Sequence, residues 1–357
     1  MGLDELGWGD VQARDYDVWA GQPDMRPGRV IIGFNYIYRV GLEEGDIEAV
    51  LSGRFKHEAT RQSELPAVGD WVVVRRRSDE DRGSIVAVLP RRSRFSRRTA
   101  GNITDEQVVA ANVDVIFIVM SLDGDFSARR LERYLLMARE SGAEPVVLLT
   151  KSDLCADPAA YVAEVAAVGG GVPVHVLSPK LNQGIDQVGP YLTSGRTGAL
   201  LGSSGVGKST IINRLVGTDV QKTREVRETD QKGRHTTTHR ELVLLPSGGL
   251  VIDTPGMREL QLWDAGEGVH GTFEDVETLS SGCHFTNCRH RDEPRCAVKA
   301  AVTEGHLPAD RLASYLKLQD ELAYLARQQD ERAQIEEKRR GKIGAKAMRQ
   351  HVKSKRG

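Results

Sequence analysis

The chain has 357 residues, of which 39% are hydrophobic and 28% are charged, and its formal net charge is −1 at pH 7. This length accommodates two or three domains with cores of their own, and the balanced charge excludes a protein that is basic over its whole surface. No stretch approaches the roughly 20 consecutive apolar residues that a membrane-spanning helix needs, and the acidic N-terminus lacks the apolar core of a signal peptide. We therefore expect a cytoplasmic protein that does not contact a membrane, and we expect it to be monomeric.

The N-terminal part of the sequence is rich in short β-type runs. Residues 1–27 mix Gly, Pro, Asp and Trp without a periodic pattern, and we interpret them as a loose lead-in. Residues 28–98 form the first predicted domain, with strand-like runs at 29–32, 35–40, 47–51, 70–74 and 84–89. Five short strands at this spacing favour a small β-barrel of the OB-fold type, and an SH3-like barrel would give nearly the same pattern.

A run of arginines closes this predicted domain. It extends from Pro90 to Arg98, contains five arginines and no acidic residue, and breaks the strand pattern. In a chain of nearly neutral charge, such a local concentration of positive charge suits a phosphate backbone and so favours an RNA partner. A solvated charged surface is the competing interpretation.

From residue 99 to residue 262 the pattern changes to alternating strands and helices. Buried strands are expected at 113–120, 145–150, 172–177, 198–201 and 250–252, with helices around 131–138, 158–168 and 184–192. This alternation predicts a parallel, doubly wound α/β sheet that is covered by helices on both faces.

A glycine loop follows one of these strands and opens a further predicted helix. It reads Gly202-Ser203-Ser204-Gly205-Val206-Gly207-Lys208-Ser209 and leads into Thr210. In this context backbone N–H groups and the helix N-terminus surround a β-phosphate, the lysine reaches the β- and γ-phosphates, and the serine hydroxyl binds Mg²⁺. The sequence therefore predicts a phosphate-binding loop for a nucleoside triphosphate.

A second motif, at the end of an earlier strand, indicates which base is bound. Thr150-Lys151-Ser152-Asp153 resembles the Asn-Lys-x-Asp motif of GTPases, with a threonine in place of the usual asparagine. Asp153 can accept hydrogen bonds from N1–H and the exocyclic amine of guanine, whereas adenine has no N1–H. The stem of Lys151 can cover one face of the base, and Ser178 matches the small residue that backs guanine. These residues predict GTP and GDP as the ligands.

The remaining nucleotide-binding candidates lie downstream of the phosphate loop. Asp253-Thr-Pro-Gly256 follows a predicted strand, so Asp253 would hold Mg²⁺ through water and the N–H of Gly256 would sense the γ-phosphate. The polar segment 221–240 contains threonines, and we expect Thr237 or Thr238 to complete the Mg²⁺ shell. Spacing does not choose between the two, and a plain exposed loop is the alternative for this segment.

The group that activates the hydrolytic water is less well defined by the sequence. Met257 stands where Ras-like GTPases carry a glutamine, and a methionine does not orient water by hydrogen bonding. His235 is the candidate, because an imidazole titrates near neutral pH and this one lies beside the switch threonines. Its competing interpretation is a solvated bystander. The catalytic candidates are therefore His235, Lys208 and Thr238.

The order of the motifs along the chain is unusual. In most GTPases the phosphate loop comes first, whereas here the base-recognition residues at 150–153 and 178 precede it. The same site can be assembled from a circularly permuted chain, because a fold depends on packing and not on where the termini fall. Permutation also places the second γ-phosphate-sensing segment, which begins with Asp253-Thr-Pro-Gly256, directly before the C-terminal segment.

Residues 263–337 are the predicted zinc-binding helical domain. Cys283-x4-Cys288-x-His290-x5-Cys296 supplies three thiols and one imidazole, a set that binds one structural Zn²⁺ in a closed tetrahedral site. His284 is a rival ligand, and buried unligated cysteines are the alternative.

A helical stripe and a basic tail follow the cysteines. Apolar residues recur at helical spacing within 310–340, at Leu312, Tyr315, Leu316, Leu322 and Leu325. The tail, residues 338–357, carries nine Lys or Arg and no acidic residue, so we expect it to be disordered or to become ordered only on a partner.

Together these features resemble one family, the circularly permuted GTPases called RsgA or YjeQ that depend on the small ribosomal subunit. The resemblance spans about residues 28–330 and rests on the barrel, on TKSD, GSSGVGKS, RHTTT and DTPG in this order, and on the cysteine–histidine cluster. It implies an OB-fold, a permuted P-loop GTPase domain and a C-terminal α-helical zinc-binding domain. It also implies subunit-stimulated GTP hydrolysis, contact with rRNA and a late role in small-subunit assembly.

Two other functions are compatible with the residues taken alone. A P-loop kinase or ATPase acting on a small molecule would bind ATP as well as GTP, which Asp153 argues against. A non-catalytic RNA-binding switch would bind GTP and barely hydrolyse it, which Met257 favours.

Overall fold

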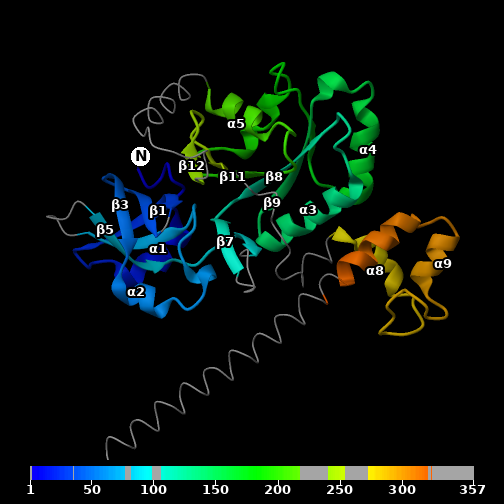
Figure 1. The fold of residues 1–357 in the computed structure, drawn as a ribbon, viewed down its shortest axis with the longest axis horizontal. Helices are drawn as coiled ribbons and strands as arrows, with labels where there is room; N and C mark the ends of the chain where they lie inside the picture. The colour runs from blue at the N-terminus through cyan, green and yellow to red at the C-terminus, as the bar shows by residue number, and fades with distance from the viewer. Residues whose placement is uncertain are drawn as a thin grey trace, which may run out of the picture. The chain divides into compact units, whose positions relative to one another are not determined.

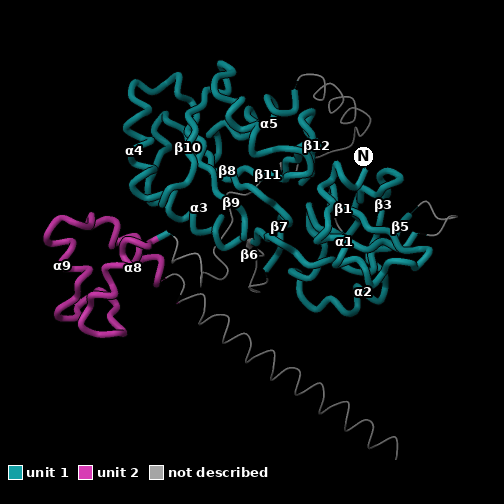
Figure 2. Tube along the Cα trace, turned by 180° about the vertical axis from the view of Figure 1, so that it is seen from behind, with its two compact units in different colours: residues 1–262, 267–272 teal, residues 263–266, 273–357 magenta. Residues whose placement is uncertain are grey.

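The computed structural model describes residues 2–34, 36–76, 82–98, 106–217, 240–253, 272–320 and 323. The chain divides into two compact units, residues 1–262 with 267–272 and residues 263–266 with 273–357, which Figure 2 shows in teal and magenta. The barrel strands and the α/β strands therefore belong to the same unit. Within the described ranges, no helix combines the length and the apolar character needed to cross a membrane.

The N-terminal segment is ordered, which differs from the loose lead-in expected from its composition. It contains helix α1 (Asp10–Tyr16) and the short 3₁₀ helix η1 (Asp17–Trp19). Leu6 is buried, and the rings of Trp8 and Trp71 meet edge to face with their centroids 4.9 Å apart. Leu6 and Trp8 anchor the segment as single large apolar residues and do not form a repeating apolar face. The sequence therefore showed no periodic pattern that would have predicted this order.

Five strands form a closed barrel. They are β1 (Met25–Phe34), β2 (Ile37–Leu42), β3 (Gly45–Leu51), β4 (Trp71–Arg75) and β5 (Arg82–Val88). The pairing order is β1-β2-β3-β5-β4, and β4 returns to pair with β1. β3 and β5 run parallel, and helices α2 (Gly53–Glu58) and η2 (Gln62–Glu64) connect β3 to β4. This arrangement is that of an OB-fold, so the OB alternative is confirmed over the SH3-like one.

A two-stranded antiparallel ribbon follows the barrel. β6 (Arg94–Arg98) pairs with β7 (Glu106–Ala111). The prediction that the whole arginine run breaks the strand pattern was therefore wrong for its second half. Phe95 is buried beside the exposed Arg94, and this alternation is a strand pattern that the arginines obscured.

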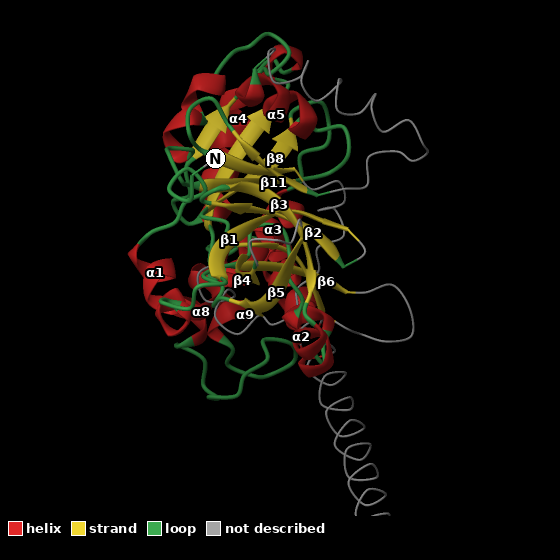
Figure 3. Ribbon diagram, turned by 90° about the vertical axis from the view of Figure 1, so that its left-hand side faces the viewer, coloured by secondary structure: helices red, strands yellow, loops and turns green. Residues whose placement is uncertain are grey.

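Five parallel strands build the α/β sheet, as the alternating pattern predicted. In sheet order they are β10 (Val174–Val176), β9 (Glu144–Thr150), β8 (Val115–Ser121), β11 (Thr197–Leu201) and β13 (Leu250–Asp253). A sixth strand that the sequence pattern did not indicate, β12 (Glu241–Leu244), lies antiparallel to β13. Figure 3 shows the barrel strands and the α/β strands as yellow arrows.

Helices cover both faces of this sheet. The longer ones are α3 (Ala128–Ser141), α4 (Pro158–Gly169) and α5 (Lys208–Val216), and three 3₁₀ turns are η3 (Ser152–Leu154), η4 (Ile185–Gln187) and η5 (Gly189–Tyr191). Val115, Phe117 and Val119 pack in one cluster with apolar residues of α5 and of the η4–η5 region. The alternate residues of β8 point to the opposite face, which α3 covers (Figure 1).

The helix expected at 184–192 is instead the pair of 3₁₀ turns η4 and η5. Gly184 adopts a left-handed conformation with φ 73°, and Pro190 lacks an N–H. An α-helix cannot run through both features, so the segment packs as two separate turns.

A buried arginine fastens the barrel to the α/β sheet. Arg29 is 1% exposed, and its guanidinium donates to three backbone carbonyls: Leu6 at 2.5 Å, Gly69 at 3.1 Å and Asn112 at 3.0 Å. Burial lowers the pKa of Arg29 to about 10. Beside this contact β1 pairs with β12 at Ile32 and Glu241, so one continuous sheet runs from the α/β strands into the barrel.

The second unit contains helices α8 (Glu274–Ser280) and α9 (Ala297–Thr303) and a helical segment at 309–320. Arg311 forms a two-pronged ion pair with Asp275, at 3.0 and 2.9 Å, and the rings of Phe273 and Tyr315 lie 5.4 Å apart. Leu312 belongs to the predicted stripe and is buried, whereas the stripe's members at 322 and 325 and the tail at 338–357 lie outside the described residues.

Candidate nucleotide site and metal centre

The glycine loop connects β11 to α5, as expected for a phosphate-binding loop. A side chain at Gly202 would bring its Cβ within 2.3 Å of the carbonyl oxygen of Val119. Gly205 and Gly207 have φ values of 77° and 101°, in the left-handed region that favours glycine. The three glycines therefore let the backbone turn closely around a space at the start of α5.

Lys208 lies at the centre of this turn. Its ammonium donates to the carbonyl oxygens of Gly202, at 2.7 Å, and Ser203, at 2.6 Å. Ser204, Gly205, Ser209 and Thr210 are exposed, and the last two belong to the first turn of α5, where backbone N–H groups and positive partial charge collect. The loop therefore combines a lysine, a hydroxyl and the backbone N–H groups of a helix start, which is the chemistry that holds a triphosphate and its Mg²⁺.

Thr150, the last residue of β9, connects the base-recognition motif to this loop. Its side chain is completely buried, and its hydroxyl donates to the carbonyl oxygen of Val206 at 2.6 Å. Val206 is itself buried inside the glycine loop. The threonine that replaces the usual asparagine therefore makes a polar contact between the two loops.

The carboxylate of Asp153 is held from the neighbouring strand. The hydroxyl of Ser178 donates to Asp153 Oδ1 at 2.5 Å, and the N–H of Ser152 donates to the carbonyl of Leu177 at 3.1 Å. Ser178 is completely buried, whereas Asp153 is exposed. A buried hydroxyl thus orients an accessible carboxylate, which is the geometry needed to accept hydrogen bonds from a base.

Lys151 has a partner that sequence reasoning missed. Its backbone is left-handed, with φ 58°, and its ammonium lies 2.5 Å from Asp123 Oδ2. The hydroxyl of Ser121 donates to the other carboxylate oxygen of Asp123 at 2.7 Å. The available signal was positional, because Ser121 ends β8, the strand that pairs with β9, and Asp123 follows two residues later.

The downstream motif begins at the same end of the sheet. Asp253 is the last residue of β13, and β13 runs parallel to β11 with Ile252 opposite Ala199. Its backbone is therefore placed beside the strand that enters the glycine loop. The side chain of Asp253, together with His235, Thr237, Thr238, Gly256 and Met257, lies outside the described residues.

In the second unit, four predicted ligands come together. One ligand atom from each of Cys283, Cys288, His290 and Cys296 lies within 4.8 Å of all the others. Sγ of Cys283 is 3.8 Å from Sγ of Cys296 and 3.6 Å from Nδ1 of His290, which is 3.4 Å from Sγ of Cys296. Tetrahedral Zn²⁺, with bonds of about 2.3 Å to sulfur and 2.0 Å to nitrogen, separates two thiolates by about 3.8 Å and a thiolate from a nitrogen by about 3.5 Å. The donor set and its spacing fit that ion, and the rival ligand His284 is not part of the cluster.

The protonation chemistry of the cluster also suits a cation. Burial lowers the pKa of His290, which favours the neutral imidazole that binds metals. Burial opposes ionisation of Cys283, but the N–H groups of Val298 and Ala297 outweigh it and leave the pKa of that thiol below its usual value. Burial, first, and the neighbouring thiols raise the pKa of Cys288 to about 11, because adjacent thiolates repel each other unless a cation joins them.

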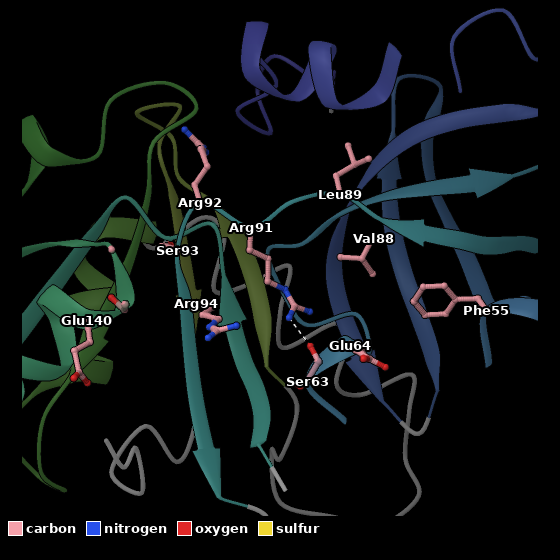
Figure 4. A pocket seen from close by; sticks show the side chains of 12 residues that line it. Phe55, Ser63, Glu64, Val88, Leu89, Arg91, Arg92, Ser93, Arg94 and Glu140 are labelled. Atoms are coloured by element: carbon pink, nitrogen blue, oxygen red, sulfur yellow. Dashed lines mark hydrogen bonds between the residues drawn. The ribbon is translucent and has the colours of Figure 1, made fainter. Parts of the chain in front are cut away.

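The arginine run is only partly available to a partner, which corrects its interpretation as one basic surface. Arg91 forms a buried two-pronged pair with Asp70, at 2.8 and 2.7 Å, and also donates to the carbonyl of Ser63 at 2.6 Å. Arg92 and Arg94 are half-exposed, and they line a cavity of about 600 Å³ between barrel residues and the end of α3 (Figure 4). Because Arg91 is buried in this ion pair, the basic surface that residues 90–98 can offer to phosphate groups is smaller than their five arginines suggest.

Comparisons with known proteins point to one family. Residues 88–263 match the family model described as RsgA GTPase. The protein named small ribosomal subunit biogenesis GTPase RsgA from Opitutus terrae is 48% identical over 339 residues, which cover 92% of each chain. The protein of the same name from Methanosarcina acetivorans is 42% identical and covers 97% of this chain and 91% of its own.

Two solved structures share the fold. The crystal structure of YjeQ from Thermotoga maritima has a TM-score of 0.60 and 28% identity, covering 84% of this chain and 99% of that one. The structure of YloQ, which is described as a circularly permuted GTPase, has a TM-score of 0.57 and 27% identity, covering 85% of this chain and 97% of that one.

Proposed function

Because this chain belongs to the RsgA GTPase family, we propose that it hydrolyses GTP while bound to the small ribosomal subunit, late in the assembly of that subunit. The chain is a GTP hydrolase, with GTP and GDP as its nucleotides and Mg²⁺ as the accompanying ion. Relatives that align with nine-tenths or more of this chain carry the name small ribosomal subunit biogenesis GTPase, which supports the small subunit as the partner, and contact with its rRNA is part of the proposal.

One contact carries the proposal: the hydrogen bond from Thr150 to Val206. The two residues are 56 positions apart, and their loops occur in the reverse of the usual GTPase order. Since the loops touch, one nucleotide can place its base at Asp153 and its phosphates at Lys208. Circular permutation then changes the order of the chain and leaves the site whole.

Within this site each motif has a defined task. Asp153, oriented by Ser178, would accept hydrogen bonds from N1–H and the exocyclic amine of guanine. Backbone N–H groups of residues 202–207 and the ammonium of Lys208 would bind the β- and γ-phosphates, and the hydroxyl of Ser209 would hold Mg²⁺. Thr237 and Asp253 would complete the Mg²⁺ shell, and Gly256 would sense the γ-phosphate.

His235 is our candidate for orienting the attacking water. Met257 takes the place of the glutamine used in Ras-like enzymes, so another polar group must act near the γ-phosphate. An imidazole beside the switch threonines can accept a proton from water, and Lys208 and Thr238 would stabilise the charge that develops on the transferred phosphoryl group.

A structural Zn²⁺ would be held by Cys283, Cys288, His290 and Cys296. Three thiolates and a neutral imidazole fill a tetrahedral shell and leave no open position for chemistry, so the ion would stabilise the fold of the second unit. The predicted domains at 28–98, 99–262 and 263–337 would then be the barrel, the GTPase domain and the zinc domain. The basic tail at 338–357 would contact rRNA, and the protein would act as a cytoplasmic monomer.

The decisive experiment is nucleotide turnover with and without purified small ribosomal subunits. We expect GTP hydrolysis to rise strongly when small subunits are added and to stay low with large subunits, while ATP is hydrolysed in neither case. Equal turnover of ATP and GTP would favour a P-loop kinase or ATPase. GTP binding without turnover, with or without subunits, would favour a non-catalytic RNA-binding switch.

A further inference from the structure

Side chains of the base-recognition tetrapeptide, residues 150–153, form polar contacts with three neighbouring loops. One of these contacts is to a residue that belongs to none of the sequence motifs described above. Thr150 contacts the phosphate loop and Asp153 contacts Ser178. Lys151 contacts Asp123, which lies between β8 and α3. The tetrapeptide, which follows β9, is thus in contact with an aspartate that follows the neighbouring strand β8.

The pair between Asp123 and Lys151 is built more firmly than an ordinary surface ion pair. Asp123 is itself held by the hydroxyl of Ser121 at 2.7 Å, and the backbone N–H of Leu122 donates to the carbonyl of Thr150 at 2.9 Å. The two strand ends are therefore joined through main chain and side chain together. The ammonium of Lys151, first, and the hydroxyl of Ser121 hold the pKa of Asp123 below its usual range, so this carboxylate stays charged at neutral pH.

A lysine stem that covers a base must be ordered to do so. A free lysine side chain loses rotamer entropy when it is fixed in one arrangement. Asp123 fixes the ammonium before a nucleotide arrives, with both side chains about one-third exposed. Because the Lys151 side chain is already ordered in the free protein, nucleotide binding does not carry the entropy cost of ordering it.

We propose that Asp123 is a positioning residue for the guanine nucleotide: by holding the ammonium of Lys151, it keeps the stem of that lysine stretched along the face of the base that Asp153 recognises. The proposal rests on the proposed use of this site for GTP. Because the contact is to the base and not to the phosphates, GDP and GTP gain equally from it.

The test is a double-mutant cycle between the two residues, with fluorescently labelled GDP and GTP titrated into the full chain. We expect Asp123→Ala to weaken both nucleotides by about fivefold, the equivalent of about 1 kcal/mol for a partly exposed ion pair. Asp123→Asn keeps an acceptor oxygen and should lose less. In the background of Lys151→Met, which keeps an unbranched stem without the charge, Asp123→Ala should have no further effect.

A matched control is available at the other end of the same strand. Glu144 begins β9 and pairs with Arg196 at 3.0 Å, with both side chains nearly half-exposed. Glu144→Ala removes a comparable ion pair far along the strand from the nucleotide loops, and it should leave both affinities unchanged.

The outcomes separate this inference from the function on which it rests. If Asp123→Ala binds both nucleotides as tightly as the wild type, the proposal fails. It also fails if Asp123→Ala lowers the affinities by the same factor in the Lys151→Met background as in the wild type, because Asp123 then does not act through Lys151. If the wild type itself shows no preference for guanine over adenine nucleotides in the same titration, the GTP site is wrong. A loss for GTP alone would place the effect at the phosphates and would also overturn the proposal.

Discussion

At the scale of single residues, Thr150 shows how the nucleotide site tolerates a change of motif. A threonine hydroxyl is shorter than an asparagine amide, yet it reaches the carbonyl of Val206 because β9 ends directly beside the glycine loop. The hydroxyl is completely buried, so its acceptor cannot turn to water if the donor is lost.

Thr150→Val keeps the shape of the side chain and removes the hydroxyl. The buried carbonyl of Val206 would then lack its donor, and an unsatisfied buried group costs about 1–3 kcal/mol. We expect the free energy of unfolding, measured by urea denaturation, to fall by about that amount and GDP affinity to fall at least about fivefold. Thr150→Ser retains the hydroxyl and serves as the control. Undiminished affinity in Thr150→Val would contradict the link between the loops.

Asp153→Asn tests the recognition of the base. An amide donates where the carboxylate accepts, so it no longer complements N1–H of guanine but does complement the C2 oxygen of xanthine. We expect preference to move from GTP to xanthosine triphosphate by at least about a hundredfold in competition titrations, an order of magnitude typical of a mispaired polar site. An unchanged affinity for GTP would refute the assignment of Asp153.

Residue patterns in the sequence predicted some side chains of the site and not others. The glycine loop, the TKSD motif and the cysteine–histidine cluster were all visible, because each is a fixed spacing of chemically distinctive residues. Asp123, Arg29 and Asp70 were not, because their partners are distant in the chain and are brought close only by the pairing of strands. The identity of a single charged residue does not indicate which distant residue it will contact in the folded chain.

At the scale of elements, the sequence predicted those that repeat a pattern. The five barrel strands and the helices α3 and α4 follow clear periods and were found. β12 has only four residues, too few to display a period, and the ribbon of β6 and β7 hides one buried phenylalanine among arginines. Short elements depend on their neighbours for stability, so local sequence says little about them.

We expect the fold of the α8–α9 region to depend on a metal ion held by the cysteine–histidine cluster. Cys288→Ser would remove one thiolate from the proposed four-ligand shell, and a structural zinc site commonly supplies much of the folding free energy of a small module. We expect metal analysis to fall from one zinc per chain to near zero, and limited proteolysis to cleave readily within residues 281–296. Cys155→Ser, outside the cluster, should keep both properties at the wild-type level. Full zinc content in Cys288→Ser would show that the shell is formed by other ligands.

At the scale of the whole molecule, the joint around Arg29 makes the barrel and the α/β sheet one unit. The side chain satisfies carbonyls from the N-terminal segment, from the barrel and from the end of the β6–β7 ribbon region. No single-domain pattern in the sequence predicts such a contact, because it forms only when three separate segments have folded.

Arg29→Met fills a similar volume but leaves the carbonyls of Leu6 and Asn112 without this donor, whereas the carbonyl of Gly69 still accepts from the side-chain amide of Asn112 at 3.1 Å. The substitution also removes the cost of burying a charged guanidinium, which offsets part of the stability lost with the hydrogen bonds. We therefore expect the free energy of unfolding to fall by about 2–4 kcal/mol in urea denaturation. Arg39→Met removes the exposed pair between Arg39 on β2 and Asp46 on β3, and it should cost at most about 1 kcal/mol. Equal losses in the two variants would mean that Arg29 does not hold the joint.

The pairing of β12 with β1 also has a consequence for solubility. Without the barrel, β12 would be the outer strand of the α/β sheet, with a row of unpaired N–H and C=O groups open to strands of other molecules. The barrel covers that row where Ile32 meets Glu241, and at the opposite margin the sheet ends in β10, which has only three residues. We therefore expect the N-terminal barrel to limit self-association as well, and we expect a GTPase domain expressed without it to be prone to aggregate.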